Sequence, residues 1–138
     1  MSFDGIVEFT LDHEGGYVKN LLDPGGETNR GISKRAYPDE DIRNMTSARA
    51  RELYKRDYWD KFDMDDDNLH MAAFDSAVNM GVGRIKSFLN GCQTWEDLIT
   101  RREEYYHLLT IRKPKMKAFL RGWLNRTREL REFIGGKK

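Results

Sequence analysis

The stretch that decides the fold is NLHMAAFDSAVNMGVG, which occupies residues 68–83. A helix that is apolar on most of its sides is usually buried, so we expect this segment to form the central helix of the protein. Asn68 is the expected N-cap, and Gly81 and Gly83 are expected to end the helix. Asp75 lies within the helix. Because a buried charge needs a partner, it should pair with an arginine or with a helix N-terminus.

Apolar residues at helical spacing predict three further helices on the C-terminal side. A short one stops at Gly91. A long one begins at Thr94, which should form a capping box with Asp97. Pro114 then breaks the chain, and the last helix should end at Gly135. The apolar residues of these helices are Ile85, Phe88, Leu89, Leu98, Ile99, Tyr105, Tyr106, Leu109, Met116, Phe119, Leu120, Trp123 and Leu130.

The N-terminal segment also repeats apolar residues at helical spacing, at Phe3, Ile6, Val7 and Leu11. Ser2 is the expected N-cap of this helix. Two consecutive glycines, at 15 and 16, are unfavourable inside a helix and should end it. These expectations make Glu14 the last helical residue and place it on the buried face.

No helical period is present between Tyr17 and Tyr37. The turn residues at 23–26 predict an ordered loop or a small hairpin there. Another helix is expected to begin at Thr46 or Ser47. The predicted fold is therefore mainly α, with one short loop or hairpin near the N-terminus.

Composition describes a polar but globular chain that should form one compact domain of 138 residues. Hydrophobic residues make up 38%, and 7 Phe, 6 Tyr and 3 Trp can anchor a core. No apolar run is long enough to cross a bilayer, so we expect no membrane insertion. The first residues lack the features of a signal peptide, so we expect synthesis in the cytoplasm. The single cysteine, Cys92, cannot form an internal disulfide and is expected to be a tolerated free thiol.

Charge is distributed unevenly along the chain. Residues 1–83 carry 10 Lys and Arg against 17 Asp and Glu, whereas residues 84–138 carry 14 against 6. A basic half can steer a protein towards a polyanion such as nucleic acid or the bacterial envelope. Solvated helix faces whose charges compensate each other would give the same counts, and both interpretations stay open here.

Carboxyl groups near the N-terminus have the chemistry that cleavage of a glycosidic bond requires. One carboxylic acid must donate a proton to the leaving oxygen, while a second carboxylate directs a water molecule or supports the cation. Glu14 is a candidate for the partly buried acid. Asp23 and Glu27 are candidates for the second carboxylate, and the hydroxyl of Thr28 could hold the attacking water. Glycosidase carboxyls lie about 5 to 9.5 Å apart, so the loop would have to fold back towards the helix.

Ordinary structural roles explain the same residues. A glutamate at a helix end is usually a solvated surface residue, and the segment at 23–26 is typical of a plain turn. The three histidines, His13, His70 and His107, lie far apart, and no metal-binding spacing is present, so we expect no metal and no cofactor.

Several motifs are similar to those of a known family. The segments HEGGYV (residues 13–18) and DPGGETNRGIS (residues 23–33) resemble the signature of phage and prophage N-acetylmuramidases, which are lysozyme-like endolysins. Further matches are YKRDYW (residues 54–59) and FDSAVNMGV (residues 74–82). Residues 105–126 resemble part of the C-terminal peptidoglycan-binding region of that family. The resemblance therefore extends over nearly the whole chain.

This resemblance implies a lysozyme-like helical domain that hydrolyses the bond between N-acetylmuramic acid and N-acetylglucosamine during host lysis. It implies that Glu14 is the catalytic acid, with Asp23 and Thr28 as further catalytic residues. The threonine is one residue closer than in the related phage pattern. Either Thr28 or Asn29 could therefore handle the water, and Glu27 could replace Asp23 as the partner. Residues 1–90 would form the catalytic region and residues 91–138 a shortened binding region.

Other residues gain expected roles from the same resemblance. Tyr17 should stack on a sugar, and Glu27 should also lie at the substrate. Asn79 should either hydrogen-bond to an N-acetyl or hydroxyl group, or act as a buried cap at a helix end. Aromatic residues on apolar stripes are expected in the core, namely Tyr58, Trp59 and Trp123. The basic C-terminal helices would attract the enzyme to the anionic wall.

Other functions remain to be separated from this one. A non-enzymatic peptidoglycan-binding protein would bind walls without cutting them, and a lytic transglycosylase would need one acid and leave anhydro sugar ends. A nucleic-acid binder is suggested only by the basic half, and we expect no such partner because no recognition motif is present. The expected partners are glycan strands of peptidoglycan and, for access to them, a holin. We expect a monomer that acts on the wall after its release from the cytoplasm.

Overall fold

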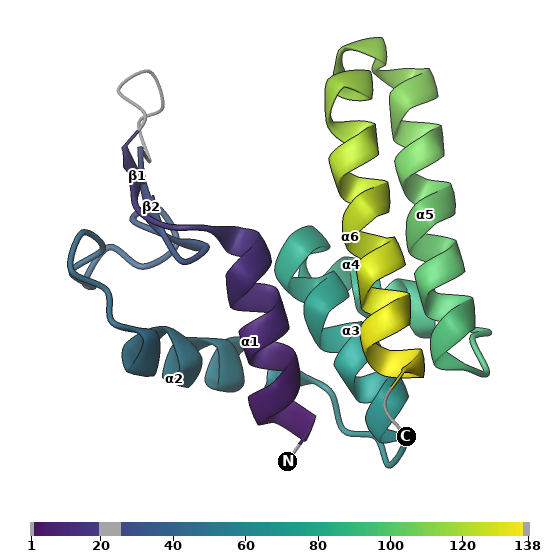
Figure 1. Ribbon diagram of the computed structural model, residues 1–138, viewed down its shortest axis with the longest axis horizontal. Coiled ribbons are helices and arrows are strands. Elements are labelled where there is room, and N and C mark those ends of the chain that lie inside the picture. Colours follow the sequence, from purple (N-terminus) through teal and green to yellow (C-terminus); the bar gives the residue numbers. More distant parts are fainter. Residues whose placement is uncertain (1, 20–25, 137–138) are drawn as a thin grey trace. The chain divides into compact units, whose positions relative to one another are not determined.

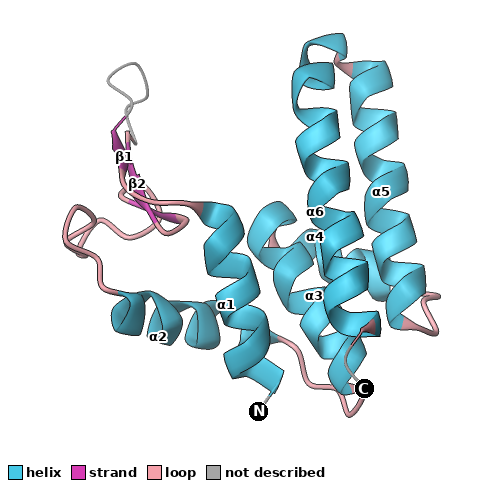
Figure 2. Cartoon of the chain, in the orientation of Figure 1, coloured by secondary structure: helices cyan, strands magenta, loops and turns pink. Residues whose placement is uncertain are grey.

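The computed structural model describes residues 2–19 and 26–136 of the chain. Its contacts separate two compact units, Met1–Lys61 and Phe62–Lys138, each of which is described by itself. Helices predominate in both, and a small sheet lies in the first unit (Figure 2). The expected fold class, mainly α with a short hairpin near the N-terminus, is confirmed. The assignment of a catalytic role to residues 1–90 and of a binding role to residues 91–138 stays a prediction.

The first helix, α1, covers Ser2–Glu14 and ends where the two glycines predict. Gly15 leaves the helix with a φ of +80°, a backbone conformation that glycine adopts without strain. The Gly15 amide still donates to the Leu11 carbonyl at 3.3 Å. Ile6 and Val7 are completely buried, so the apolar face of α1 is fixed in the core while Glu14 stands at its last position.

Three short antiparallel strands follow α1 in the order β1 (Val18–Lys19), β2 (Glu27–Asn29) and β3 (Ile32–Ser33). Thr28 lies at the centre of this sheet, opposite Val18 on one side and Ser33 on the other. Asn29 lies opposite Ile32, which closes β2 and β3 into a tight hairpin. The small hairpin expected between residues 17 and 37 is confirmed (Figure 1).

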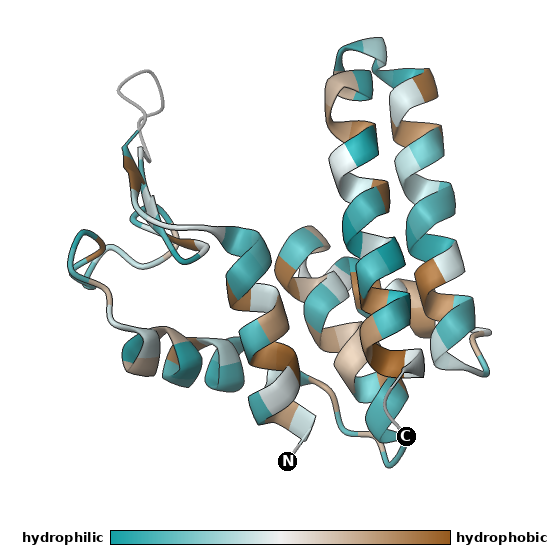
Figure 3. Cartoon of the chain, in the orientation of Figure 1, coloured by the Kyte–Doolittle hydropathy of each residue, from teal (hydrophilic) through white to brown (hydrophobic). Residues whose placement is uncertain are grey.

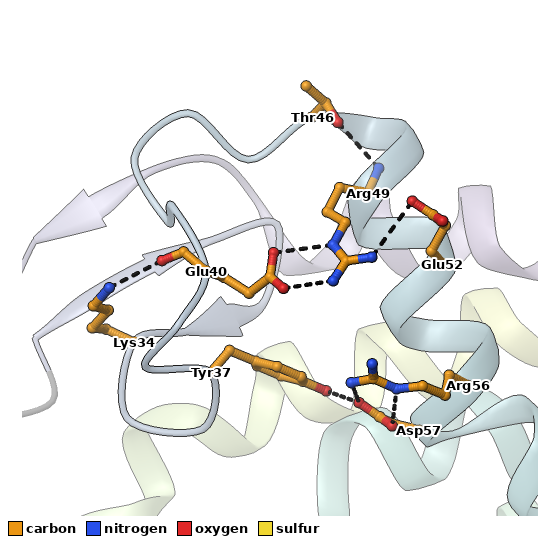
Figure 4. A network of polar contacts seen from close by, with 8 residues as sticks. All are labelled: Lys34, Tyr37, Glu40, Thr46, Arg49, Glu52, Arg56 and Asp57. Atoms are coloured by element: carbon orange, nitrogen blue, oxygen red, sulfur yellow. Dashed lines mark hydrogen bonds and ion pairs between the residues drawn. The ribbon is translucent and has the colours of Figure 1, made fainter.

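The loop after the sheet is tied to the next helix, α2 (Ser47–Asp57), by polar contacts that Figure 4 shows. Arg49 on α2 donates two hydrogen bonds to the Glu40 carboxylate, at 3.0 and 2.6 Å. The Tyr37 hydroxyl donates to Asp57 at 2.7 Å, and burial together with this bond raises the pKa of Tyr37. Helix α2 begins at Ser47, one of its two expected start positions, and Thr46 is its N-cap. A short 3₁₀ turn, η1 (Trp59–Lys61), ends this unit.

The second unit begins with the expected central helix, α3, which covers Asp67–Met80. Asn68 is not its N-cap. Asp66 takes that position and accepts a hydrogen bond from the Leu69 amide at 3.1 Å. A carboxylate at a helix N-terminus also interacts favourably with the helix dipole, which an amide does not. Gly81, with a φ of +98°, separates α3 from α4 (Val82–Leu89), so Gly83 lies inside α4 and does not end a helix.

Two long helices complete this unit. These are α5 (Trp95–Arg112) and α6 (Lys117–Gly135), which lie side by side and are joined by the 3₁₀ turn η2 (Pro114–Met116) (Figure 1). Thr94 and Asp97 form the expected capping box of α5. Helix α3 contacts α4, α5 and α6, which makes it the centre of the unit, as expected. Its residues from His70 to Ala77 are all buried.

Asp75 is the buried charge that α3 places at the centre of this unit. Arg102 of α5 and Arg126 of α6 both contact it, at 2.9 and 2.8 Å, so the expected arginine pairing is confirmed and involves two arginines. Burial alone would raise the pKa of Asp75, but the two guanidinium groups overcome that effect and hold the pKa well below its usual range. Arg102 is completely buried, and its Nη2 makes no hydrogen bond with the described part of the chain.

Some aromatic residues are less buried than their apolar stripes predict. Tyr58, Trp59 and Trp123, expected in the core, are only partly buried, and Phe119 is 56% exposed. The apolar segments of the buried helices are visible as brown bands in Figure 3. Within residues 2–19 and 26–136, no helix is both long enough and apolar enough to span a bilayer.

Candidate functional site

Glu14 is held at the junction between α1 and the hairpin of β2 and β3. It is partly buried. Its side chain lies so close to Gly31 that a Cβ atom added there would be 2.9 Å from both the Cγ and the Oε1 of Glu14. Gly31 therefore forms part of the wall against which this carboxyl group is placed.

The turn at Arg30 and Gly31 explains how the chain approaches Glu14 so closely. Both residues have positive φ, +54° and +80°, as in the two-residue turns that match the twist of a hairpin. Glycine adopts this conformation freely, whereas an arginine needs support. The Tyr54 hydroxyl supplies it by donating to the Arg30 carbonyl at 2.5 Å, and the Arg30 Nε donates to the Met45 carbonyl at 3.3 Å.

Tyr54 of α2 borders the Glu14 carboxyl group, and a second tyrosine, Tyr58, follows directly after this helix. A Cβ atom at Gly31 would be only 2.2 Å from the Tyr54 hydroxyl as well as close to Glu14, so this hydroxyl and Glu14 approach the same point. Tyr58 lies one helical turn further, with its ring centre 5.7 Å from that of Tyr54. Burial raises the pKa of Tyr58, and the charges of Asp57 and Glu14 raise it further.

Tyr17 and Glu27, both expected at the substrate, contact each other. The Tyr17 hydroxyl donates to Glu27 Oε2 at 2.7 Å, and this hydrogen bond raises the pKa of Tyr17. The Arg43 guanidinium lies 5.7 Å from the centre of the Tyr17 ring. The hydrogen bond between Tyr17 and Glu27 connects the residue before β1 to the first residue of β2. Tyr17 remains 36% exposed.

Thr28 and Asn29 differ clearly in their surroundings. The Asn29 Nδ2 donates to the carbonyls of Ile42 and Arg43, at 3.0 and 3.2 Å, and the residue is buried. Asn29 therefore anchors the following loop to the sheet. Side chains alternate along a strand, so Thr28 lies on the opposite face from Asn29.

Two remaining candidates, Asp23 and Asn79, are not part of the contacts described above. Asp23 lies outside the described residues. Asn79 belongs to the second unit, where it is partly buried at the end of α3 and its Oδ1 accepts a hydrogen bond from Tyr106. Tyr106 in turn accepts a hydrogen bond from Arg102 Nε at 2.9 Å. Among the described residues, no group of three or more His, Cys, Asp or Glu side chains could hold a metal ion.

Sequence reasoning did not identify Gly31 and Tyr54 as neighbours of Glu14. Tyr54 and Tyr58 follow the helical period of α2, which is equally typical of an apolar stripe that faces a core. A signal was nevertheless present, because both carry hydroxyl groups and lie four residues apart, hence on the same face of a helix. Two aliphatic residues would have filled a core equally well.

The family model described as Glycosyl hydrolase 108 matches residues 7–81, which is more than half of the chain. The chain belongs to glycosyl hydrolase family 108. Membership makes it a glycoside hydrolase. The matched segment begins within α1 and ends just beyond α3, and it includes Glu14, the sheet and the two tyrosines.

A solved structure, "Structure of Brucella abortus SagA", has the same fold with a TM-score of 0.68. It is 20% identical to this family 108 chain, and the alignment covers 97% of this chain and 94% of that one. A search of curated proteins gives no match.

Replacing Gly31 by Ala should destabilise this family 108 enzyme by at least about 1 to 2 kcal/mol, the usual penalty for a side chain at positive φ. The added Cβ would also overlap the Tyr54 hydroxyl and Glu14. Urea unfolding of the purified variants measures the effect.

Gly15→Ala is the matched control for this substitution. Gly15 has the same φ of +80°, but an added Cβ would meet nothing within 4 Å. Gly31→Ala should therefore cost more than Gly15→Ala. Equal losses in the free energy of unfolding of the two variants would mean that the close approach of Glu14 and Tyr54 to Gly31 does not contribute to the effect of Gly31→Ala.

Proposed function

We propose that this family 108 member is a peptidoglycan N-acetylmuramidase, which hydrolyses the bond between N-acetylmuramic acid and N-acetylglucosamine. The observation that carries the proposal is the fixed position of Glu14 at the end of α1, against Gly31, within the segment that the family model matches. A partly buried carboxylic acid placed against Gly31, a residue without a side chain, suits proton donation to a glycosidic oxygen.

In the proposed mechanism, the Glu14 carboxyl group donates its proton to the leaving oxygen as the bond to the sugar carbon breaks. A second carboxylate, Asp23 or Glu27, directs the water or supports the positive charge on the sugar. Thr28 holds the attacking water by its hydroxyl group. Preference for Thr28 over Asn29 is supported by the hydrogen bonds that commit the Asn29 amide to the carbonyls of Ile42 and Arg43.

Substrate binding is assigned to Tyr17, Glu27 and Asn79. The exposed part of the Tyr17 ring would stack on a sugar, and Glu27 fixes the orientation of that ring through its hydrogen bond. Asn79 would hydrogen-bond to an N-acetyl or hydroxyl group. The orientation of the Asn79 carboxamide is fixed by two linked hydrogen bonds, which begin at Arg102. An arginine side chain can only donate hydrogen bonds. Since Arg102 donates to Tyr106, the single Tyr106 proton goes to Asn79 Oδ1, and the Asn79 amino group remains to donate to a ligand.

The proposed biological setting is lysis of a bacterial host by a phage or prophage. The enzyme would be synthesised in the cytoplasm as a monomer and would depend on a holin for access to the wall. The positive charge of residues 84–138, with 14 Lys and Arg against 6 Asp and Glu, supports attraction to an anionic wall.

Incubation with purified sacculi tests this function directly. A muramidase releases muropeptides with reducing N-acetylmuramic acid ends, which borohydride reduction and mass spectrometry identify. Anhydro ends would show a lytic transglycosylase instead. Binding to sacculi without any release of fragments would contradict the enzymatic proposal and favour a binding protein.

Removing the Tyr106 hydroxyl in Tyr106→Phe should raise KM for soluble glycan fragments about fivefold while kcat changes little. The expected cause is the loss of the hydrogen bond that orients the Asn79 carboxamide, which should make the free energy of substrate binding less favourable by about 1 kcal/mol. Asn79→Ala should have a similar effect, and the double variant should be no worse than either single variant.

Tyr105→Phe is the matched control, because Tyr105 is the neighbouring tyrosine and its hydroxyl makes no hydrogen bond with a described residue. Its KM should equal that of the wild type. Independent, additive effects of Tyr106→Phe and Asn79→Ala would contradict the positioning role of Tyr106.

A further inference from the structure

The end of the α5–α6 hairpin exposes a group of large apolar side chains. Leu108 and Ile111 lie in the last two turns of α5 and are 49% and 74% exposed, and Phe119 lies in the first turn of α6 and is 56% exposed. These are the only large apolar side chains in the described part of the second unit with such exposure. We call residues 108–121, which include η2, the hairpin tip (Figure 1).

The hairpin tip is also strongly basic. No Asp or Glu occurs from Tyr105 to Arg128. Five cations of the tip are exposed, and none of them forms an ion pair with a residue that the structure describes. They are Arg112, Lys113, Lys115, Lys117 and Arg121.

The exposed apolar residues of the tip belong to ordered helices. Phe119 stacks on Trp123 with ring centres 5.9 Å apart, and Trp123 stacks on Tyr106 at 4.8 Å. Tyr106 is buried and hydrogen-bonded to Arg102 in the core of the unit. A row of aromatic rings thus connects the tip to the buried core. Because Trp123 packs against the Phe119 ring and holds it in place, the exposure of Phe119 is a property of the fold.

Cations next to exposed apolar side chains fit a surface that offers both anionic groups and an apolar layer. An anionic phospholipid bilayer has this composition, since phosphate headgroups cover an acyl region. A wall polysaccharide or a nucleic acid supplies the negative charge without the apolar layer.

We propose that the hairpin tip binds the surface of anionic phospholipid membranes, with its cations at the headgroups and Leu108, Ile111 and Phe119 at the acyl boundary. This contact lies along the surface and does not cross the bilayer. It goes beyond the proposed hydrolysis and does not depend on it, because the tip contains none of the residues assigned to that reaction.

Sedimentation of the full chain with lipid vesicles tests the proposal. Binding is expected to vesicles of equal parts phosphatidylglycerol and phosphatidylcholine, and much weaker binding to phosphatidylcholine alone. The variant Leu108→Gln with Ile111→Gln keeps the charge and the helix and should bind at least about tenfold more weakly, because two apolar side chains no longer leave water. Each of Lys113→Gln, Lys115→Gln and Lys117→Gln should weaken binding about fivefold.

Val18→Thr is the control for the apolar substitutions, because Val18 is 58% exposed but lies on β1. It should bind vesicles like the wild type. Three results would overturn the proposal: no binding to anionic vesicles, an unchanged affinity in Leu108→Gln with Ile111→Gln, or a dimer in sedimentation equilibrium that this double variant converts to monomer. The release of reducing ends from sacculi tests the proposed hydrolysis separately. A failure of the membrane proposal and a failure of the hydrolysis proposal therefore give different results.

Discussion

Glu14→Gln should reduce the release of reducing ends from sacculi by about two to four orders of magnitude, the usual contribution of a general acid. Glutamine has nearly the same shape as glutamate but cannot donate a proton to the leaving oxygen. The variant should remain folded, because a glutamine side chain would still fit against Gly31 and near the Tyr54 hydroxyl. Muropeptide release measures the activity, and circular dichroism with urea unfolding measures the fold.

Glu8→Gln is the matched control for this experiment. Glu8 also belongs to α1, its side chain is 54% exposed, and it forms an ion pair with Arg51. This substitution should leave the activity at the wild-type level, since exposed ion pairs contribute little to stability. Wild-type activity in a folded Glu14→Gln protein would remove the acid from the proposed mechanism and would leave the proposed function without its central observation.

Asp75→Asn should lower the free energy of unfolding by about 3 to 5 kcal/mol, which is the largest effect on stability that we expect. The substitution leaves Arg102 and Arg126 close together without the carboxylate that both contact. A buried charge without a compensating partner has a high desolvation penalty. Urea or thermal unfolding measures the loss.

The same carboxylate predicts how stability depends on pH. Its pKa is depressed in the folded protein, so folding is favoured above the unfolded pKa of Asp, near 3.9, and this contribution is lost as the pH falls below that value. Asp75→Asn should therefore flatten the acid side of the stability profile. Asp60→Asn, which removes an exposed partner of Lys55 at 2.8 Å, should leave that side unchanged. An acid profile identical in wild type and Asp75→Asn would contradict this origin.

Local signals predicted much of the fold correctly. The end of α1 at Glu14 follows from the two glycines, and the capping box at Thr94 follows from an Asp three residues later. The need of Asp75 for a partner follows from the apolar character of its helix, and of the two expected kinds of partner, an arginine or a helix N-terminus, the structure shows arginine. Each of these depends on interactions within a few residues or on a general cost of burial, which a sequence displays directly.

Other features depend on contacts between distant segments, which a sequence does not display. The positive φ of Arg30 is unusual for its residue type and is supported by Tyr54, 24 residues away. Likewise, Asn79 meets Tyr106 only because α3 packs against α5. The expected N-cap of α3 was Asn68, but Asp66, two residues earlier, is also a good capping residue, and its hydrogen bond with the Leu69 amide shows that it is the cap.

The three-residue cluster around Asp75 also constrains how the gene can be divided. The carboxylate lies within the family-matched segment, residues 7–81, whereas both of its guanidinium partners come later in the chain, on α5 and α6. A fragment that stops at residue 81 would contain an acid without its counter-ions and should not fold independently. Chimeras that exchange the C-terminal helices between relatives would need to preserve both arginines.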